Sequence, residues 1–136
     1  MSAVNTCDVL LRKGTEEEIY PGEIKDIVLS ALSNALRTIP ENSRSADVIK
    51  DIIEHNDYEE LGKSHADRVK AIMKGYTGMT RKIRTSFEEM GFVFTTHKTH
   101  VNAYYGDKRY RVTFAATPSD IRTGKNLASD IIKICF

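Results

Sequence analysis

The chain has 136 residues, a hydrophobic content of 40% and a formal net charge of +1. This length fits one domain, or one small domain with a helical extension, and the apolar content is too high for a disordered chain. No apolar run approaches the roughly 18 residues of a membrane span, and no signal-peptide pattern is present. We therefore expect a cytoplasmic protein without a membrane partner.

The charges divide the sequence near Lys63. From Lys63 onward fourteen Lys and Arg stand against six Asp and Glu, whereas the preceding part carries a net charge of −7. A basic segment of this kind indicates a surface for an anionic partner such as nucleic acid. The alternative is that the acidic and basic halves dock on each other.

The first predicted helix follows Pro21-Gly22 and ends before Pro40. Its apolar residues fall at the three-and-four spacing of one helical face. They are Ile24, Ile27, Val28, Ala31, Leu32, Ala35, Leu36 and Ile39. This stripe can be core, or it can bind a second copy of the chain or a protein partner.

Two more helices are predicted before Gly75-Tyr76-Thr77-Gly78. Ser43 or Ser45 can cap the first of them, because a hydroxyl accepts a hydrogen bond from the free N–H groups of a first turn. Ser64 is expected to cap the second, with His65 on its polar side and without a role. Their apolar stripes are Val48, Ile49, Ile52 and Ile53 in the first, and Val69, Ile72, Met73 and Tyr76 in the second.

The last third of the chain changes from helical to alternating periodicity. Thr80 is expected to cap a helix over Arg81–Met90, and Gly91 to end it. Alternation from Phe92, again over 100–105, and over 109–114 after the turn 106–108, predicts strands that form a hairpin. A final helix is predicted from about Thr123 to Ile134, with Leu127, Ile131 and Ile134 buried.

This order predicts an α+β fold. An N-terminal helical segment precedes a small α-β-β-(β)-α unit, whose antiparallel sheet packs against helices. We expect an acidic helical segment over residues 1–78 and a basic domain over residues 79–136. The polar strand residues should lie on the open face of the sheet.

Candidate functional residues gather in the basic domain. His100 on an exposed strand can act as a general acid or base on RNA, while Lys98, Arg109, Arg111 and Lys125 can contact phosphates. Tyr104, near the hairpin turn, can stack on a base. The alternatives are surface histidines, cross-strand aromatic packing and a simple helix start at Gly124-Lys125-Asn126. The pair His97 and His100 has no nearby carboxylate or other third ligand, and the two cysteines, Cys7 and Cys135, lack C-x-x-C spacing. Neither a metal nor a cofactor is therefore expected.

Residues from about Thr80 to Cys135 resemble HicA-type mRNA interferases, which are related to double-stranded-RNA-binding domains. The matching segments are Phe87-Glu-Glu-Met-Gly-Phe92, His97-Lys-Thr-His100, Arg109-Tyr-Arg-Val-Thr-Phe114 and Gly124-Lys-Asn-Leu127. The resemblance implies that His100 is catalytic and that the sheet face binds RNA. The sequence departs from the family at Lys98-Thr99, where Gly-Ser is usual, at the displaced Pro118, and in its first eighty residues, which have no counterpart.

We therefore expect an RNA-binding domain that is a candidate metal-independent ribonuclease, with His100 as its catalytic residue. The alternatives are a non-enzymatic nucleic-acid-binding module and a protein-interaction domain whose acidic helices mask the basic face. The absence of a nucleotide-binding fingerprint or carboxylate cluster argues against a metabolic enzyme.

Overall fold

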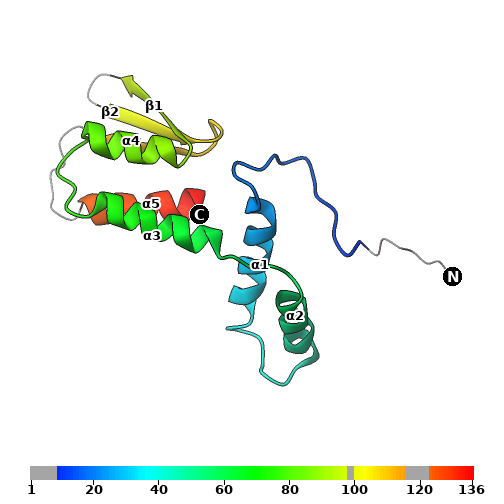
Figure 1. Ribbon diagram of the computed structural model, residues 1–136. Coiled ribbons are helices and arrows are strands. Elements are labelled where there is room, and N and C mark those ends of the chain that lie inside the picture. The colour runs from blue at the N-terminus through cyan, green and yellow to red at the C-terminus, as the bar shows by residue number, and fades with distance from the viewer. Residues whose placement is uncertain (1–8, 98–99, 116–122) are drawn as a thin grey trace.

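A computed structural model describes residues 9–97, 100–115 and 123–136. In these ranges, helices pack on one face of a three-stranded antiparallel sheet (Figure 1). The predicted α+β fold is confirmed, including its third strand. The elements are α1 (Glu23–Ala35), α2 (Arg44–Glu54), α3 (Leu61–Met73), α4 (Arg81–Glu89), β1 (Phe92–His97), β2 (His100–Tyr105), β3 (Arg111–Ala115) and α5 (Thr123–Cys135).

The sheet has the order β1-β2-β3, with β2 in the centre. Val93 of β1 is paired with Tyr104 of β2, and Tyr104 is paired with Arg111 of β3. These three residues therefore lie side by side across the sheet. Successive side chains of a strand point to opposite faces. The alternation of large apolar and polar residues therefore produces one buried face and one open face.

The buried face and the helices share one apolar core. The sheet contributes Phe92, Phe94, Ala103, Tyr105, Val112 and Phe114. Phe87 of α4 has no exposed surface, and its ring centroid lies 5.2 Å from that of Phe92 and 5.9 Å from that of Phe114. Ile131 of α5 is equally buried. Aromatic packing thus holds α4 against the sheet, and the apolar side chain of Ile131 holds α5 there.

The same core extends into α3, on the other side of the boundary predicted near residue 78. Val69 and Met73 are 0% and 2% exposed, and both pack in the cluster that contains Phe87. Tyr76, just after α3, places its ring centroid 6.3 Å from that of Phe114. The helical layer below the sheet thus includes α3, which lies mainly against α5 (Figure 1).

Two predicted helix caps are confirmed, and a third is wrong. Ser43 Oγ accepts a hydrogen bond from the Ala46 N–H of α2, and Thr80 Oγ1 accepts one from the Ile83 N–H of α4, both at 3.2 Å. The expected cap at Ser64 is wrong, because α3 already begins at Leu61. Its first N–H groups are capped from α1, by a carboxylate distant in sequence.

That carboxylate belongs to Asp26, which is 4% exposed. Its Oδ1 accepts a hydrogen bond from Leu61 N at 2.8 Å, and its Oδ2 accepts one from Gly62 N at 2.9 Å. Free N–H groups at a helix start favour an anion through their partial positive charge. Asp26 thus joins α1 to α3 and supplies a cap that the local sequence lacks.

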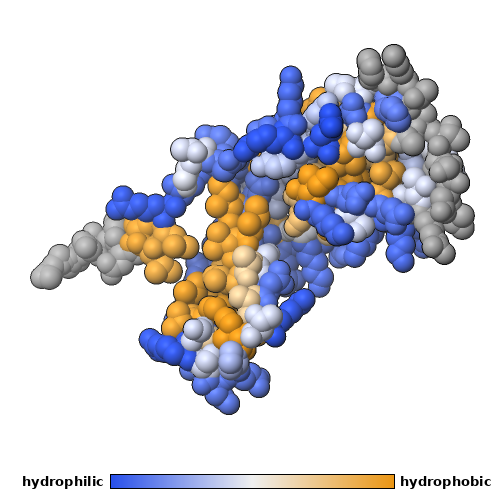
Figure 2. Space-filling model, turned by 180° about the vertical axis from the view of Figure 1, so that it is seen from behind, coloured by the Kyte–Doolittle hydropathy of each residue, from blue (hydrophilic) through white to orange (hydrophobic). Residues whose placement is uncertain are grey.

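The apolar stripe predicted for the first helix is not the face that α1 buries. The buried residues of α1 are Glu23, Asp26 and Leu29, whereas Ile27 is 56% exposed. The predicted burial of Ile134 in the last helix is also wrong, since this residue is 45% exposed. Figure 2 shows the resulting apolar band on the surface along α1.

An arm before α1 lies on the turn between β2 and β3. Ile19 packs so closely on Gly106 that a Cβ there would lie 2.7 Å from the Ile19 side chain. Gly106 also has a φ of +66°, which favours glycine. Glycine at this turn therefore permits the arm to dock on the hairpin.

Candidate nucleic-acid interface

The open face of the sheet brings together polar residues from all three strands. The register aligns Thr95, Asn102 and Thr113 in one row, and Val93, Tyr104 and Arg111 in the next. His100 lies on the same face of β2 as Asn102 and Tyr104, because the three are two residues apart. The surface combines a titratable ring, hydrogen-bonding groups, an aromatic ring and a cation.

His100 is exposed at the start of β2, and its backbone partners are His97 on β1 and Ala115 on β3. An exposed imidazole can accept or donate a proton at neutral pH. Next to it, the Thr113 hydroxyl donates a 2.7 Å hydrogen bond to the amide oxygen of Asn102. This bond leaves the Asn102 amide N–H₂ group available as a donor on the open face.

Tyr104 and Arg111 face each other at the other end of the open face. Together with Lys108, Arg109 and Ile134 of α5 they line a hollow of about 510 Å³. Tyr104 is half-buried and Arg111 is exposed. A ring beside a guanidinium offers a stacking surface and a phosphate contact in one place.

Arg109, a predicted phosphate contact, is already paired with carboxylates. Its guanidinium donates to both carboxylate oxygens of Glu16, at 2.8 and 3.0 Å, and to Asp107 Oδ2 at 3.1 Å. Hydrogen bonds from Arg109 hold the pKa of Glu16 below its usual range, and the two carboxylates raise the pKa of Arg109. The arm before α1 therefore neutralises this cation.

Of the two remaining predicted cations, only Lys125 can be placed relative to His100. Lys98 lies outside the described residues. Lys125 is exposed on α5, on the helical side of the sheet and away from the open face (Figure 1). The structure thus brings His100, Tyr104 and Arg111 onto one face, holds Arg109 at its margin and separates Lys125 from it.

Sequence reasoning missed a second basic site, where Lys125 meets Lys70, Lys74 and Lys133 around a groove between α3 and α5. The spacing of these lysines could have revealed the site, because Lys70 and Lys74 are four residues apart and Lys125 and Lys133 are eight apart. Residues at such spacings lie on the same side of a helix. The expectation that His65 lies on a polar helix surface is also wrong. Its ring packs at 4.5 Å from Tyr20 and 5.1 Å from Phe136, between centroids.

No family model matches the chain, and comparisons with curated proteins and with solved structures found no match either. Over the described ranges, no three His, Cys, Asp or Glu side chains lie close enough together to hold a metal ion. Within the same ranges, every helix is too short or too polar to cross a membrane. Function must therefore be argued from the geometry of the sheet and the helices.

Proposed function

We propose that this chain is an RNA-binding protein that holds single-stranded RNA on the open face of its sheet and cleaves it with His100. The observation that carries the proposal is the strand register, which places His100, Asn102, Tyr104 and Arg111 on one uncovered face. RNA recognition commonly uses such a face, with bases stacked on aromatic rings and phosphates bound by cations.

The order of elements in the basic part adds support. The sequence α4-β1-β2-β3-α5, with both helices on one face of an antiparallel sheet, is the arrangement implied by the resemblance to HicA-type interferases and double-stranded-RNA-binding domains. We propose on this basis that the chain is related to these RNA-binding families. A fold alone does not define an activity, so the catalytic claim rests on His100.

In the proposed reaction His100 accepts the proton of a 2′-hydroxyl. The 2′-oxygen then attacks the adjacent phosphorus, and the P–O bond to the 5′-oxygen of the next nucleotide breaks. The products are a 2′,3′-cyclic phosphate and a 5′-hydroxyl, which takes its proton from water or from the imidazolium. A positioned general base typically contributes about 10²- to 10⁴-fold to such a rate.

The proposal gives different roles to Arg111 and Lys98. His100 and Tyr104, the partner of Arg111, are four positions apart on β2, which corresponds to about 13 Å along the strand. Arg111 therefore suits a phosphate farther along the RNA strand than the one next to the cleaved bond. Lys98, two residues before His100, is the candidate for neutralising the charge that develops at the reacting phosphate.

The test is a gel-shift and cleavage assay on single-stranded and double-stranded RNA, at low and high salt and with EDTA. We expect cleavage that survives EDTA, and binding that weakens as salt rises. His100→Ala should lower the rate about 10²-fold or more while the affinity for RNA changes little. His55→Ala is the matched control, because His55 is exposed at the end of α2, far from the sheet.

Two outcomes would contradict the enzymatic proposal. Equal cleavage by the wild type and His100→Ala would remove the catalytic role of His100. Salt-sensitive binding without turnover would identify a non-enzymatic recognition module. Lys98→Ala and Arg111→Ala separate the cation roles, since the first should lower the cleavage rate and the second mainly the affinity.

A second candidate function is protein interaction through the helical segment. The observation that favours it is the apolar band along α1, where Ile27 remains 56% exposed (Figure 2). Ile24, Ile27 and Ile134 together line a hollow between the arm and α5. Contiguous exposed apolar surface of this kind often marks an association site, here for a second copy of the chain.

A further inference from the structure

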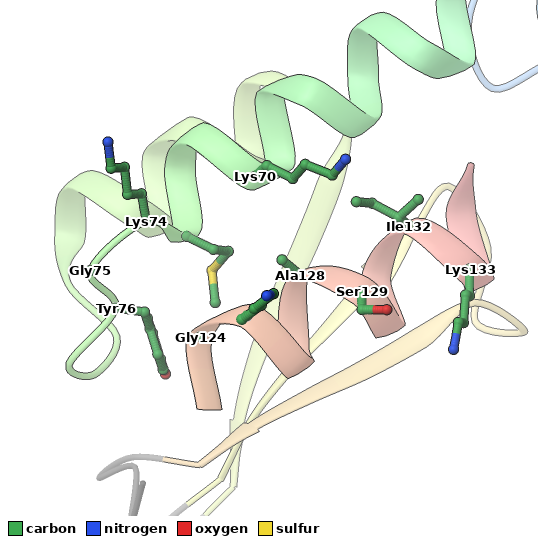
Figure 3. A pocket seen from close by; sticks show the side chains of 11 residues that line it. Lys70, Lys74, Gly75, Tyr76, Gly124, Ala128, Ser129, Ile132 and Lys133 are labelled. Carbon is green, nitrogen blue, oxygen red and sulfur yellow. The ribbon is translucent and has the colours of Figure 1, made fainter. Parts of the chain in front are cut away.

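The groove between α3 and α5 has the composition of a small-molecule site. It has a volume of about 680 Å³, within the range of ligand pockets. Its apolar lining comes from Met73, Tyr76, Ala128 and Ile132, and Figure 3 shows the two helices that form its walls. It lies on the helical side of the sheet, so it is separate from the open face that carries the proposed RNA site.

One end of the groove is closed by a very tight approach. A Cβ on Gly124 would lie 2.8 Å from Tyr76 Cβ and 3.1 Å from the Met73 carbonyl oxygen. Gly124 is itself buried. The start of α5 can therefore pack directly on the end of α3, where Met73, Tyr76 and Gly124 all line the groove.

Among the described residues that line the groove, every charged side chain is a lysine. Lys70 and Lys74 come from α3 and its end, and Lys125 and Lys133 from α5. Asp and Glu are absent from the described lining residues, and no carboxylate in the described part of the chain forms an ion pair with these four lysines. In Figure 3 the Lys70 side chain extends toward α5, near Ile132, whereas Lys74 and Lys133 extend outward.

These features call for a ligand with two parts. The apolar lining favours a hydrocarbon body, because its burial is favourable by about 25 cal/mol per Å². Unpaired ammonium groups at the rim favour an anionic head, and lysine stems add apolar wall beneath their charged ends. A purely ionic ligand would leave the apolar lining of the groove exposed to water. A neutral apolar ligand would leave the lysines without a counter-charge.

We propose that this groove binds a small amphiphilic anion, a molecule with a phosphate or carboxylate head and an apolar chain. The chain lies over Ala128 and Ile132, and the head is held by Lys70 and Lys125. The Ser129 hydroxyl, which also lines the groove, can add a hydrogen bond to the head. This site is independent of RNA binding on the open face.

The test uses octyl phosphate as the probe, with octyl glucoside and inorganic phosphate as its neutral and chain-free counterparts. Calorimetry should show saturable one-to-one binding of octyl phosphate, at least about tenfold tighter than either counterpart. In NMR spectra of the labelled protein, the Gly124 and Ala128 signals should shift, and those of Asn102 and Thr113 should not.

Three variants locate the site. Lys70→Gln and Lys125→Gln should each weaken octyl phosphate binding by about tenfold, because each removes a charged hydrogen-bond donor. Ser129→Phe should abolish binding by filling the groove, and the fold should persist because Ser129 is exposed. Lys82→Gln, at an exposed lysine on α4, is the matched control and should bind as the wild type does.

Other results would overturn the proposal. Equal affinity for inorganic phosphate would show that the lysines recognise charge alone, and equal affinity for octyl glucoside would show an apolar groove alone. Displacement of octyl phosphate by single-stranded RNA, lost in Lys125→Gln, would assign the groove to the nucleic acid. Unchanged affinity in both lysine variants would place octyl phosphate elsewhere.

Discussion

At the residue scale, His65 is a titratable group held among aromatic rings. It lies between Tyr20 and Phe136, and its buried Nδ1 has no hydrogen-bond partner among the described residues. Burial lowers the pKa of His65 below its ordinary value, and Arg68 lowers it further. Asp26 and Glu23 raise it by a smaller amount. The neutral ring is therefore the form that fits the folded state.

This pKa shift predicts that mild acid destabilises the fold. In the unfolded chain His65 binds a proton near pH 6.5, whereas in the folded chain it does so only at lower pH. Below about pH 6.5 the unfolded state thus binds more protons, and the free energy of unfolding falls as the pH falls. Urea denaturation from pH 7.5 to 5 should show this fall, and His65→Phe should reduce it.

His55→Gln is the control for this measurement. Hydrogen bonding to the Asp51 backbone raises the pKa of His55, and the Asp51 carboxylate adds to the effect, so His55 contributes in the opposite direction. Its removal should leave the acid sensitivity in place or make it slightly steeper. A pH profile of His65→Phe parallel to that of the wild type would contradict the burial argument.

At the scale of the elements, Asp26 connects two helices that are distant in sequence. Its two carboxylate oxygens accept hydrogen bonds from the first N–H groups of α3, and Glu60 before them adopts a φ of +53°. A non-glycine residue in that conformation is held there by its surroundings. The start of α3 therefore depends on α1.

Asp26→Ala is expected to lower the free energy of unfolding by about 1–3 kcal/mol, because it removes a helix cap and two hydrogen bonds of a buried group. Asp67→Ala, at an exposed position within α3, should change it by less than about 0.5 kcal/mol. Urea denaturation at neutral pH measures both values. Similar stabilities for the two variants would show that Leu61 and Gly62 find other partners.

The outcome for helix caps explains which features a sequence can predict. Ser43, Thr80 and Gly91 act on residues within the same turn, so their short spacing reveals them. The strand alternation is local in the same sense, and it correctly placed the open face. Asp26 instead binds Leu61, 35 residues away, and Arg109 binds Glu16, 93 residues away. Contacts between residues so far apart in sequence leave no periodic pattern from which they could be predicted.

At the scale of the whole molecule, the apolar core does not follow the charge of the sequence. The division near residue 78 separates acidic from basic sequence, but the apolar core joins α3 to the sheet and to α5. By contrast, α1 and α2 extend from one end of this unit (Figure 1). The part of the helical segment that carries an exposed apolar face is thus the pair α1 and α2.

That face leads to a prediction about association. Ile27 is 56% exposed on α1, and Val48 is 37% exposed on α2. If two copies pair through α1, sedimentation velocity should show a dimer whose fraction rises with protein concentration. Ile27→Glu should raise the dissociation constant at least about tenfold, since burying an isoleucine is worth about 1.5–3 kcal/mol and a carboxylate opposes burial.

Lys25→Glu is the control that distinguishes apolar contact from charge. Lys25 is exposed and lies two residues from Ile27, which places it on a different side of α1. Its substitution changes the charge of the helix by more than Ile27→Glu does, yet it should leave the dimer intact. Loss of association in both variants would assign it to charge, and a dimer that persists in Ile27→Glu would place the interface outside α1. A wild-type chain that stays monomeric at high concentration would contradict self-association, and a different protein would then be the candidate partner of the α1 face.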